Sequence, residues 1–319
     1  MIAFGPVPSR RLGRSLGINN IPPKVCTYSC VYCQVGRTTE MQVERRQFYD
    51  PEWILRDVQT KVEKTKEISE SVDYLTFVPD GEPTLDINLG CEIKNLNQMG
   101  FPIAVITNSS LIWREDVRTE LAQADWVSLK VDAVLPETWR RVNRPHKKLQ
   151  LASIQDGMLR FARSYDGKLV TETMLVRDIN DGEDHLRKVA KFLARLKPDI
   201  AYLSIPTRPP AEAWAQPPDE CVINRAYQIL SEKVERVEYL IGYEGNAFAF
   251  TGNIEEDLLS ITAVHPMRKD AVSEFLGRAR GDWSAIHQLV AQNRLLETEY
   301  GGHKFYLRKL GKPVADSTH

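Results

Sequence analysis

The chain has 319 residues, a formal net charge of -1 at pH 7 and 27% charged residues. This length fits one large domain with a small one, and the near-zero charge excludes a global field that attracts nucleic acid or an anionic membrane. Five cysteines, three of them crowded, no apolar run of about 18 residues and no basic-then-apolar leader predict a cytoplasmic protein with no membrane contact.

Residues 4–14 are rich in proline and glycine, and we expect an irregular arm there. Arg10, Arg11 and Arg14 lie in this arm, just before the first expected strand at 15–19. Guanidinium groups bind phosphate and carboxylate well, so the three arginines are candidate substrate contacts. Surface or inter-domain salt bridges are the alternative interpretation.

Three cysteines crowd into the next segment. Cys26, Cys30 and Cys33 have the spacing C-x-x-x-C-x-x-C, with Tyr32 directly before the third. Thiolates are soft ligands that bind zinc or an iron–sulfur cluster, and no second C-x-x-C pair is present to complete a zinc site. Three ligands on a four-iron cluster leave one iron open for a small molecule. A three-ligand zinc site and unpaired core cysteines are the alternatives.

This loop resembles the signature of the radical S-adenosylmethionine (radical SAM) superfamily. The resemblance implies a 4Fe–4S cluster on the three cysteines, with SAM bound to the open iron. It further implies reductive cleavage of SAM to a 5′-deoxyadenosyl radical, and an electron donor of the flavodoxin or ferredoxin type. The fold that it implies is a partial (β/α) barrel.

Apolar strands and amphipathic helices alternate after a helix at 51–66 that Asp50 caps. We expect strands at 73–78, 101–107, 126–131, 169–176 and 200–205, and helices at 88–99, 115–122, 149–163, 183–196 and 219–232. This alternation predicts parallel β/α units with right-handed crossovers. With the strand at 15–19 it predicts an α/β fold, a partial (β/α)6 barrel over residues 1–250, whose site lies at the carboxyl ends of the strands.

Several polar residues follow or occupy these strands. Gly81 and Glu82 come after the second strand and resemble the superfamily's glycine–glycine–glutamate segment, which contacts the amino group of SAM; Asp80 stands in place of the first glycine. Asn108, after the third strand, suits adenosyl or substrate hydroxyls. Glu172 in the fifth strand is an acid expected near SAM if its face points inward.

Alternation in the fourth strand points Ser128, Lys130 and Asp132 into the barrel. A buried Lys–Asp pair is costly unless the charges are paired or used. The resemblance places ribose contacts of SAM near Ser128 and Asp132. Lys130 is either a substrate contact or the structural partner of an acid.

Two further arginines surround the expected barrel mouth. Arg37 leads out of the cysteine loop, and Arg208 follows the sixth strand in a proline-rich loop that we expect to lie over the mouth. Together with the arginines of the arm they predict an anionic substrate. Residues 143–146 are expected to form an exposed basic turn.

The pattern changes near residue 250. We expect helices at 255–263, 267–279 and 282–292, and β-rich runs at 295–300 and 304–310 around the turn signal Gly301-Gly302. Three helices followed by a two-stranded wing resemble a winged-helix module, here over 251–319. Residues 286–292 of its third helix carry no Lys or Arg, which favours docking of a substrate or partner over free DNA binding.

Within the superfamily the core is most similar to the wybutosine-pathway family, which rebuilds a guanosine base of tRNA with pyruvate. The similar segments are the cysteine loop and residues 81–85, 131–133, 141–145 and 174–180. The extra N-terminal cysteines of that family are absent from this sequence, and the C-terminal module is not part of that enzyme. We predict a radical SAM enzyme acting on an anionic substrate, with a tRNA base favoured over a small metabolite or peptide. The alternative is a redox-sensing iron–sulfur regulator whose winged helix binds nucleic acid or protein.

Overall fold

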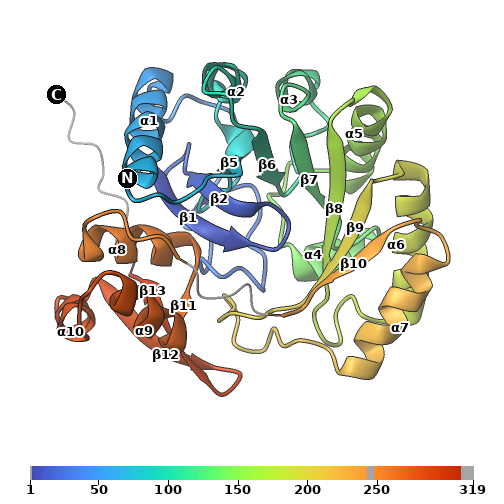
Figure 1. The fold of residues 1–319 in the computed structure, drawn as a ribbon. Coiled ribbons are helices and arrows are strands. Elements are labelled where there is room, and N and C mark those ends of the chain that lie inside the picture. The colour runs from blue at the N-terminus through green and yellow to red at the C-terminus, as the bar shows by residue number, and fades with distance from the viewer. Residues whose placement is uncertain (1, 243–247, 310–319) are drawn as a thin grey trace.

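The centre of the computed structural model, which describes residues 2–242 and 248–309, is a curled eight-stranded sheet with helices on its outer face (Figure 1). Six parallel strands form its middle in the order β2, β5, β6, β7, β8, β9. Their bounds are Gly13–Ile18, Tyr74–Phe77, Ile103–Thr107, Trp126–Lys130, Lys168–Met174 and Ile200–Ser204. The predicted partial (β/α)6 barrel is thus confirmed.

The helices between these strands follow the predicted order. They are α1 (Pro51–Glu67), α2 (Leu89–Asn97), α3 (Glu115–Leu121), α5 (Leu151–Ser164), α6 (Glu183–Leu196) and α7 (Glu220–Ser231). Helix α1 begins as its sequence indicates, because the Asp50 carboxylate accepts a hydrogen bond from the Glu52 amide at 2.9 Å. Its buried residues Ile54, Val58 and Val62 recur every four positions and so face the sheet.

Five elements between residues 20 and 240 were not expected. A helical turn η1 (Pro83–Leu85) and a seven-residue helix α4 (Pro136–Val142) follow β5 and β7. Strand β10 (Val237–Leu240) extends the parallel sheet beside β9, and the short strands β3 (Val25–Cys26) and β4 (Glu40–Met41) pair within the cysteine segment.

The expectation of an irregular arm at 4–14 was wrong, because β1 (Ala3–Ser9) is an antiparallel edge strand on β2. Prolines are tolerated at an edge, where their missing N–H leaves no ladder bond unmade, and the pairing is irregular between Phe4 and Val7. The Phe4 ring lies on Gly17 of β2, where an added Cβ would come within 2.0 Å of it. This glycine therefore lets an aromatic ring occupy the inner face of the barrel.

The sheet separates two apolar layers. The larger one lies between the strands and the outer helices and includes Leu75, Val105 and Leu129. A small cluster fills the inside of the barrel, and its buried members are Leu12, Ala104, Trp126, Val170, Ile200 and Tyr202. Because Trp126 faces inward, Ser128 and Lys130 of the same strand do so as well. The inner face of β7 is therefore apolar at Trp126 and polar from Ser128 toward the carboxyl end of the strand.

A small α+β module follows residue 250, as the sequence indicated. It contains α8 (Ile254–Val264), α9 (Lys269–Arg278), α10 (Ser284–Ala291) and a sheet of β11 (Met267–Arg268), β13 (His303–Arg308) and β12 (Leu295–Tyr300). Strand β11 replaces the first residues of the predicted helix 267–279. The module has a core of its own around Phe275, Ile286 and Leu295. Residues 310–319 of the predicted module lie outside the described residues, and the boundary near residue 250 stays a prediction.

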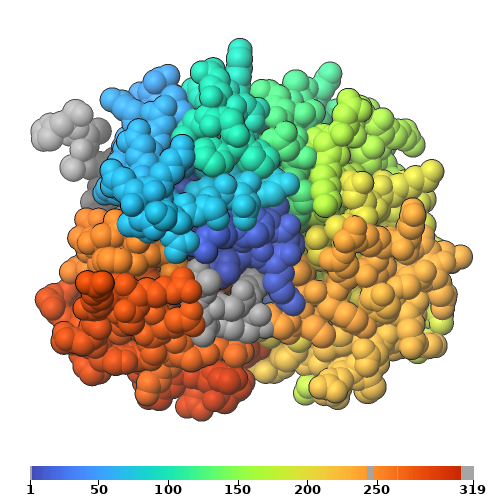
Figure 2. Space-filling model, in the orientation of Figure 1, coloured from blue at the N-terminus to red at the C-terminus, as the bar shows by residue number. Residues whose placement is uncertain are grey.

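The module packs against the amino-terminal part of the barrel, where Figure 2 shows it beside α1 and the first hairpin. Lys61 of α1 forms a buried ion pair with Asp257 of α8 at 2.8 Å, and the Asp257 carboxylate also accepts hydrogen bonds from the backbone and hydroxyl of Thr251. In the described parts of the chain, no helix combines the length and apolar character needed to cross a bilayer.

We expect the buried Lys61–Asp257 ion pair to contribute to the free energy of unfolding of the protein. Lys61→Met removes one partner and leaves the buried Asp257 carboxylate without its cation, which should lower the free energy of unfolding by about 3 kcal/mol. Lys64→Met is the matched control, because Lys64 is exposed on the same helix. Chemical denaturation measures both variants, and equal losses would contradict the role of the pair.

Candidate functional site

The cysteine loop lies at the carboxyl edge of the parallel strands and is held there by backbone hydrogen bonds. The amides of Ser29 and Val31 donate to the carbonyls of Asn143 at 3.1 Å and Val142 at 3.0 Å. The Cys33 amide donates to the Cys30 carbonyl at 3.1 Å, which turns the loop between the last two cysteines. All three cysteines are half-buried free thiols.

Two asparagine amides point at these thiols. The Asn108 Nδ2 lies 3.4 Å from the Cys26 Sγ and 2.8 Å from the Thr27 hydroxyl. The Asn143 Nδ2 lies 3.5 Å from the Cys30 Sγ. Asn108 was predicted as a site residue, whereas Asn143 was missed and placed in an exposed turn. It is 2% exposed, because the unexpected helix α4 ends at Val142 and turns Asn143 inward.

The chemistry of the three thiols fits a cationic iron–sulfur centre. Burial raises the pKa of each thiol, to about 12 for Cys30, and the Glu82 and Asp132 carboxylates raise those of Cys26 and Cys30 further. Thiolates here therefore need a positive centre to form. Among the described residues, no three Cys, His, Asp or Glu side chains are grouped closely enough to hold a single metal ion. The spacing of the thiols therefore suits a centre with several irons, in which each iron takes one thiol. Such centres accept hydrogen bonds at their sulfurs, which the two asparagines offer.

Glu82 fixes the corner between β5 and β6. Its carboxylate accepts hydrogen bonds from the hydroxyls of Thr84 and Thr107, each at 2.6 Å, and from the Asn108 amide at 2.7 Å. Glu82 is 1% exposed, and both of its oxygens are engaged by the chain itself. Its neighbour Gly81 is required sterically, since a Cβ there would lie 1.9 Å from the Val25 carbonyl oxygen. The segment therefore presses directly against the strand that carries Cys26.

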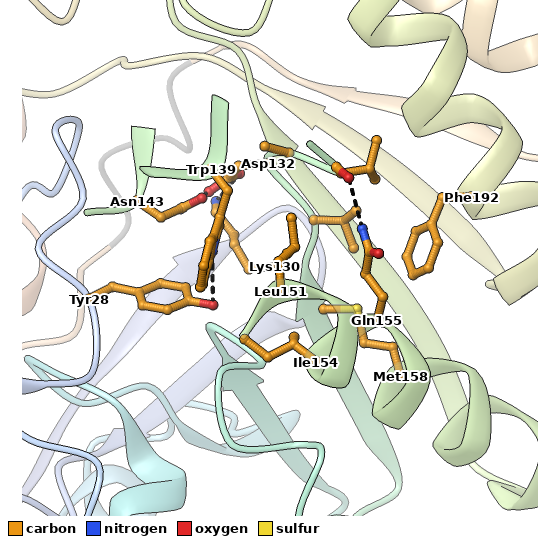
Figure 3. Close-up of a pocket in the computed structure, with 13 residues that line it drawn as sticks. Tyr28, Lys130, Asp132, Trp139, Asn143, Leu151, Ile154, Gln155, Met158 and Phe192 are labelled. Carbon is orange, nitrogen blue, oxygen red and sulfur yellow. Dashed lines mark hydrogen bonds and ion pairs between the residues drawn. The ribbon is translucent and has the colours of Figure 1, made fainter. Parts of the chain in front are cut away.

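Asp132 links the cysteine loop to β8. Its Oδ2 accepts hydrogen bonds from the Tyr32 hydroxyl and, at 2.7 Å, from Asn143, and its Oδ1 accepts one from the Met174 amide at 2.9 Å. Burial raises the pKa of this carboxyl, although Lys130 and these donors oppose the shift. Figure 3 shows Asn143 reaching Asp132 beside a cavity of about 10 Å³, which has room for no more than one water. Both oxygens of Asp132 are thus already used within the chain.

Glu172 forms the largest ion cluster inside the barrel. It accepts from Lys130 at 2.6 Å, from Arg11 at 2.7 Å and from the Ser204 hydroxyl at 2.8 Å. Burial opposes ionisation of this carboxyl, but the two cations hold its pKa well below the usual range. Of the two interpretations offered for Lys130, the structural ion pair is the observed one. Ser128 is buried on the same inner face of β7.

Only some of the predicted arginines lie near the mouth of the barrel. Arg14 was misplaced by the sequence analysis, because it pairs with Glu70 at the amino-terminal end of β2, opposite the site. Arg11 lies inside the barrel on Glu172, and Arg10 is exposed in the β1–β2 turn. Two predicted arginines do lie near the cysteine loop. Arg37 donates hydrogen bonds from its Nε and Nη2 to the two carboxylate oxygens of Glu212, each at 2.9 Å, and Arg208 donates to the Gln34 side chain at 2.8 Å.

Asp80 differs from the buried acids Glu82, Asp132 and Glu172. It is 3% exposed, its Oδ1 has no hydrogen-bond partner, and burial raises its pKa to about 7 against the opposing charges of Arg308 and Lys24. Glu82, Asp132 and Glu172 each have several donors from the chain. The free carboxylate therefore stands out at the position where the superfamily has its first glycine.

The buried Asp80 carboxyl predicts that the free energy of unfolding of the ligand-free protein depends on pH. The folded pKa of Asp80 lies above the unfolded value of about 3.9, so its contribution to stability is full below that pH and is lost as the pH rises through about 7. Relative to Asp80→Asn, the wild type should lose about 3 to 4 kcal/mol of unfolding free energy between pH 4 and pH 8, at roughly 1.4 kcal/mol per pKa unit. Denaturant titrations across this range measure the difference, and a constant difference would contradict the burial of an unpaired carboxyl.

The sequence matches the Radical SAM superfamily over residues 20–203. It is 49% identical to the UPF0026 protein MJ1312 of Methanocaldococcus jannaschii, over 97% of this chain and 96% of the relative. It is also 28% identical to an S-adenosylmethionine-dependent nucleotide dehydratase of Flammeovirga pacifica, over 91% of this chain and 96% of that protein.

A solved structure of TYW1 with a lysine-pyruvate adduct bound shares the fold, with a TM-score of 0.55 and 18% identity over 69% of this chain and 74% of the other. The match over residues 20–203 contains the three clustered cysteines, the Glu82 corner, the parallel strands β5, β6, β7 and β8, and β9 except its last residue. The chain therefore belongs to the radical SAM superfamily and, by its likeness over nearly its full length, to the UPF0026 family.

Proposed function

We propose that Cys26, Cys30 and Cys33 hold a 4Fe–4S cluster and that the protein uses it with SAM to remove a hydrogen atom from an anionic substrate. The observation that supports this most is the loop of three free thiols at the carboxyl edge of the parallel strands, with two asparagine amides on the sulfurs. When bound, the cluster supplies the electron that splits the sulfonium of SAM and frees a 5′-deoxyadenosyl radical. Membership in the superfamily implies both cofactors.

We assign different roles to the predicted cofactor-binding residues. Glu82 and Asp132 are saturated by donors of the chain, so we assign them the task of holding Asn108, Asn143 and Tyr32 in place. Gly81 allows the backbone to approach the cysteine segment, and Ser128 stays a candidate contact for the ribose of SAM. Glu172 pairs with both Lys130 and Arg11 beneath the site. Contacts to SAM thus come from groups that these carboxylates position.

The substrate class rests on charge near the cysteine loop. The Arg37 side chain is 70% exposed, and it shares the Glu212 carboxylate with Arg144. Arg208 reaches the same loop through Gln34. We propose a nucleotide as substrate, either free or as a base of tRNA, because guanidinium groups from separate segments suit a phosphate frame. The likeness to a protein named as a nucleotide dehydratase and the wybutosine-like core both support a nucleotide. An electron donor of the flavodoxin or ferredoxin type remains part of this proposal.

The first test asks whether the loop cysteines carry the chemistry. Cys30→Ser should lose the cluster absorbance and the formation of 5′-deoxyadenosine from SAM under reducing, anaerobic conditions, while the protein stays folded. Cys221→Ala is the matched control, because Cys221 is an exposed thiol outside the loop, and it should retain both signals. Stoichiometric zinc without iron would contradict the proposal. A cluster without any 5′-deoxyadenosine would favour the redox-sensing regulator instead.

A second test concerns the asparagine amides. A hydrogen bond to a cluster sulfur stabilises the more electron-rich reduced state, so Asn143→Leu should lower the midpoint potential. A bond of about 1 kcal/mol corresponds to roughly 40 mV for one electron. Asn95→Leu serves as control, since the Asn95 amide lies 3.9 Å from Cys91, which is outside the loop. A redox titration followed by electron paramagnetic resonance measures both, and an unchanged potential in Asn143→Leu would contradict the assigned contact.

A further inference from the structure

The loop between β9 and α7 presents an exposed tryptophan on a well-anchored backbone. Trp214 is 49% exposed, whereas the next side chain, that of Ala215, is buried. The Ala215 amide donates to the Glu212 carbonyl, and the Gln216 amide donates to the Trp214 carbonyl, each at 2.9 Å. A single exposed aromatic residue is ordinary on a protein surface, so the meaning of this one depends on its neighbours.

The indole is joined to a pair of arginines. The Arg144 guanidinium lies 5.9 Å from the centre of the Trp214 ring. Arg144 and Arg37 both form ion pairs with the buried carboxylate of Glu212. Because two cations share one carboxylate, a net positive charge remains beside the ring. The exposed indole therefore lies in a locally cationic surface.

The segments that carry these side chains are attached to the cysteine loop. The Glu212 amide donates to the Val31 carbonyl at 2.9 Å. The Ser29 amide donates to the carbonyl of Arg144 at 3.2 Å. Arg37 lies four residues beyond the last cysteine of the loop. The indole and both guanidinium groups are thus positioned together at the carboxyl edge of the parallel strands, before any ligand binds.

Arg144 also belongs to a basic stretch of the surface. Residues 140–148 contain no acid and five cations: Arg140, Arg141, Arg144, Lys147 and Lys148. Except for the half-buried Arg144, all of these cations are exposed. A free nucleotide carries its phosphates at one point, whereas a nucleic acid strand carries one phosphate on every nucleotide. A basic stretch of this length therefore fits a strand better than a free nucleotide.

An aromatic ring beside guanidinium groups is the combination that binds single-stranded nucleic acid. Unpaired bases stack on exposed aromatic side chains, and guanidinium groups bind the neighbouring phosphates. In a duplex the faces of each base are covered by the adjacent bases, so an indole at the surface selects unpaired bases. The ring and the charges of this surface thus fit the two chemical parts of one nucleotide within a strand.

We propose that Trp214 stacks an unpaired base of an RNA strand and that Arg37 and Arg144 bind its phosphates, with residues 140–148 along the continuing backbone. The inference deepens the proposed nucleotide substrate and rests on the proposed function for the choice of RNA over DNA. The strand is then held at the rim of the barrel beside the cysteine loop. Trp214 is a positioning residue in this arrangement, because the base that it stacks stays at the surface.

The binding test measures the fluorescence anisotropy of a labelled single-stranded RNA of about ten nucleotides on the cluster-loaded full chain. Trp214→Ala should weaken binding about fivefold or more, because it removes one stacked base. Trp214→Phe should keep most of the affinity, because a phenyl ring also stacks. Trp113→Ala is the matched control and should bind as the wild type does. Trp113 is 45% exposed and has the Arg114 guanidinium 5.8 Å from its ring centre, so it offers the same pair of groups elsewhere.

Salt dependence tests the arginines separately from stacking. Each phosphate contact on a single strand contributes about 0.7 to the slope of log affinity against log salt, so Arg144→Gln should reduce that slope by about 0.7. Trp214→Ala should leave the slope unchanged. Arg187→Gln is the matched control, because Arg187 of α6 is a comparably exposed arginine that is also paired with an acid. A duplex of the same sequence has no unpaired base, so Trp214→Ala should not change its binding.

Several results would overturn the inference. They are no binding of the single strand by the wild type, equal binding by Trp214→Ala and Trp113→Ala, and binding of adenosine monophosphate as tight as that of the strand. The competing assignment of this surface is the docking site of an acidic electron carrier. In that case Trp214→Ala slows reduction of the cluster by reduced flavodoxin and leaves RNA binding unchanged, which also overturns the inference.

The binding measurements need no cleavage of SAM, so they separate this inference from the proposed function. A protein that binds RNA through Trp214 but forms no 5′-deoxyadenosine contradicts the proposed function alone. A protein that forms 5′-deoxyadenosine but binds RNA independently of Trp214 contradicts the inference alone.

Discussion

The ion cluster around Glu172 supports the rest of the barrel interior. One carboxylate joins Lys130 of β7, Ser204 of β9 and Arg11 of the β1–β2 turn, and so ties three neighbouring strands to the amino-terminal hairpin. Removing one member of such a buried group leaves charge without compensation, which costs about 3 to 5 kcal/mol. Apolar side chains fill the barrel interior on the amino-terminal side of this cluster. The cluster therefore marks the level of the barrel from which polar side chains line the interior. The residues at the carboxyl ends of the strands are positioned from this layer.

Two other carboxylates repeat this arrangement nearer the cysteine loop. Glu82 holds the end of β6 and Asn108, while Asp132 holds Tyr32 and Asn143. In each case an acid that the sequence placed in contact with SAM uses its oxygens on the chain. The residues that remain directed at the thiols are neutral amides, which add no charge beside the three cysteines. The two acids therefore fix the positions of the groups that lie beside the thiols.

The sequence predicted the six parallel strands and the helices between them because apolar runs and amphipathic patterns alternate with little ambiguity. It missed β1, since Pro6 and Pro8 usually exclude a strand and are tolerated here only at an edge. It missed α4, a single seven-residue helix, and with it the burial of Asn143. The pairing of Tyr32 with Asp132 or of Arg11 with Glu172 spans 100 residues or more. Such partners are set by strand order in space, which spacing along the chain does not reveal.

The C-terminal module contacts separate segments of the barrel and, together with it, lines a cavity of about 190 Å³. The buried Lys61–Asp257 pair fixes it to α1, and the Tyr300 hydroxyl donates to the Pro206 carbonyl beyond β9 at 3.1 Å. Burial lowers the pKa of His265, so this ring stays neutral and its Nε2, 3.0 Å from the Arg208 guanidinium, is able to accept a hydrogen bond. Contacts to separate segments restrict rotation far more than one contact does. A module held in this way keeps Arg308 in the lining of the same cavity as Asp80, which a freely moving docking domain would not do.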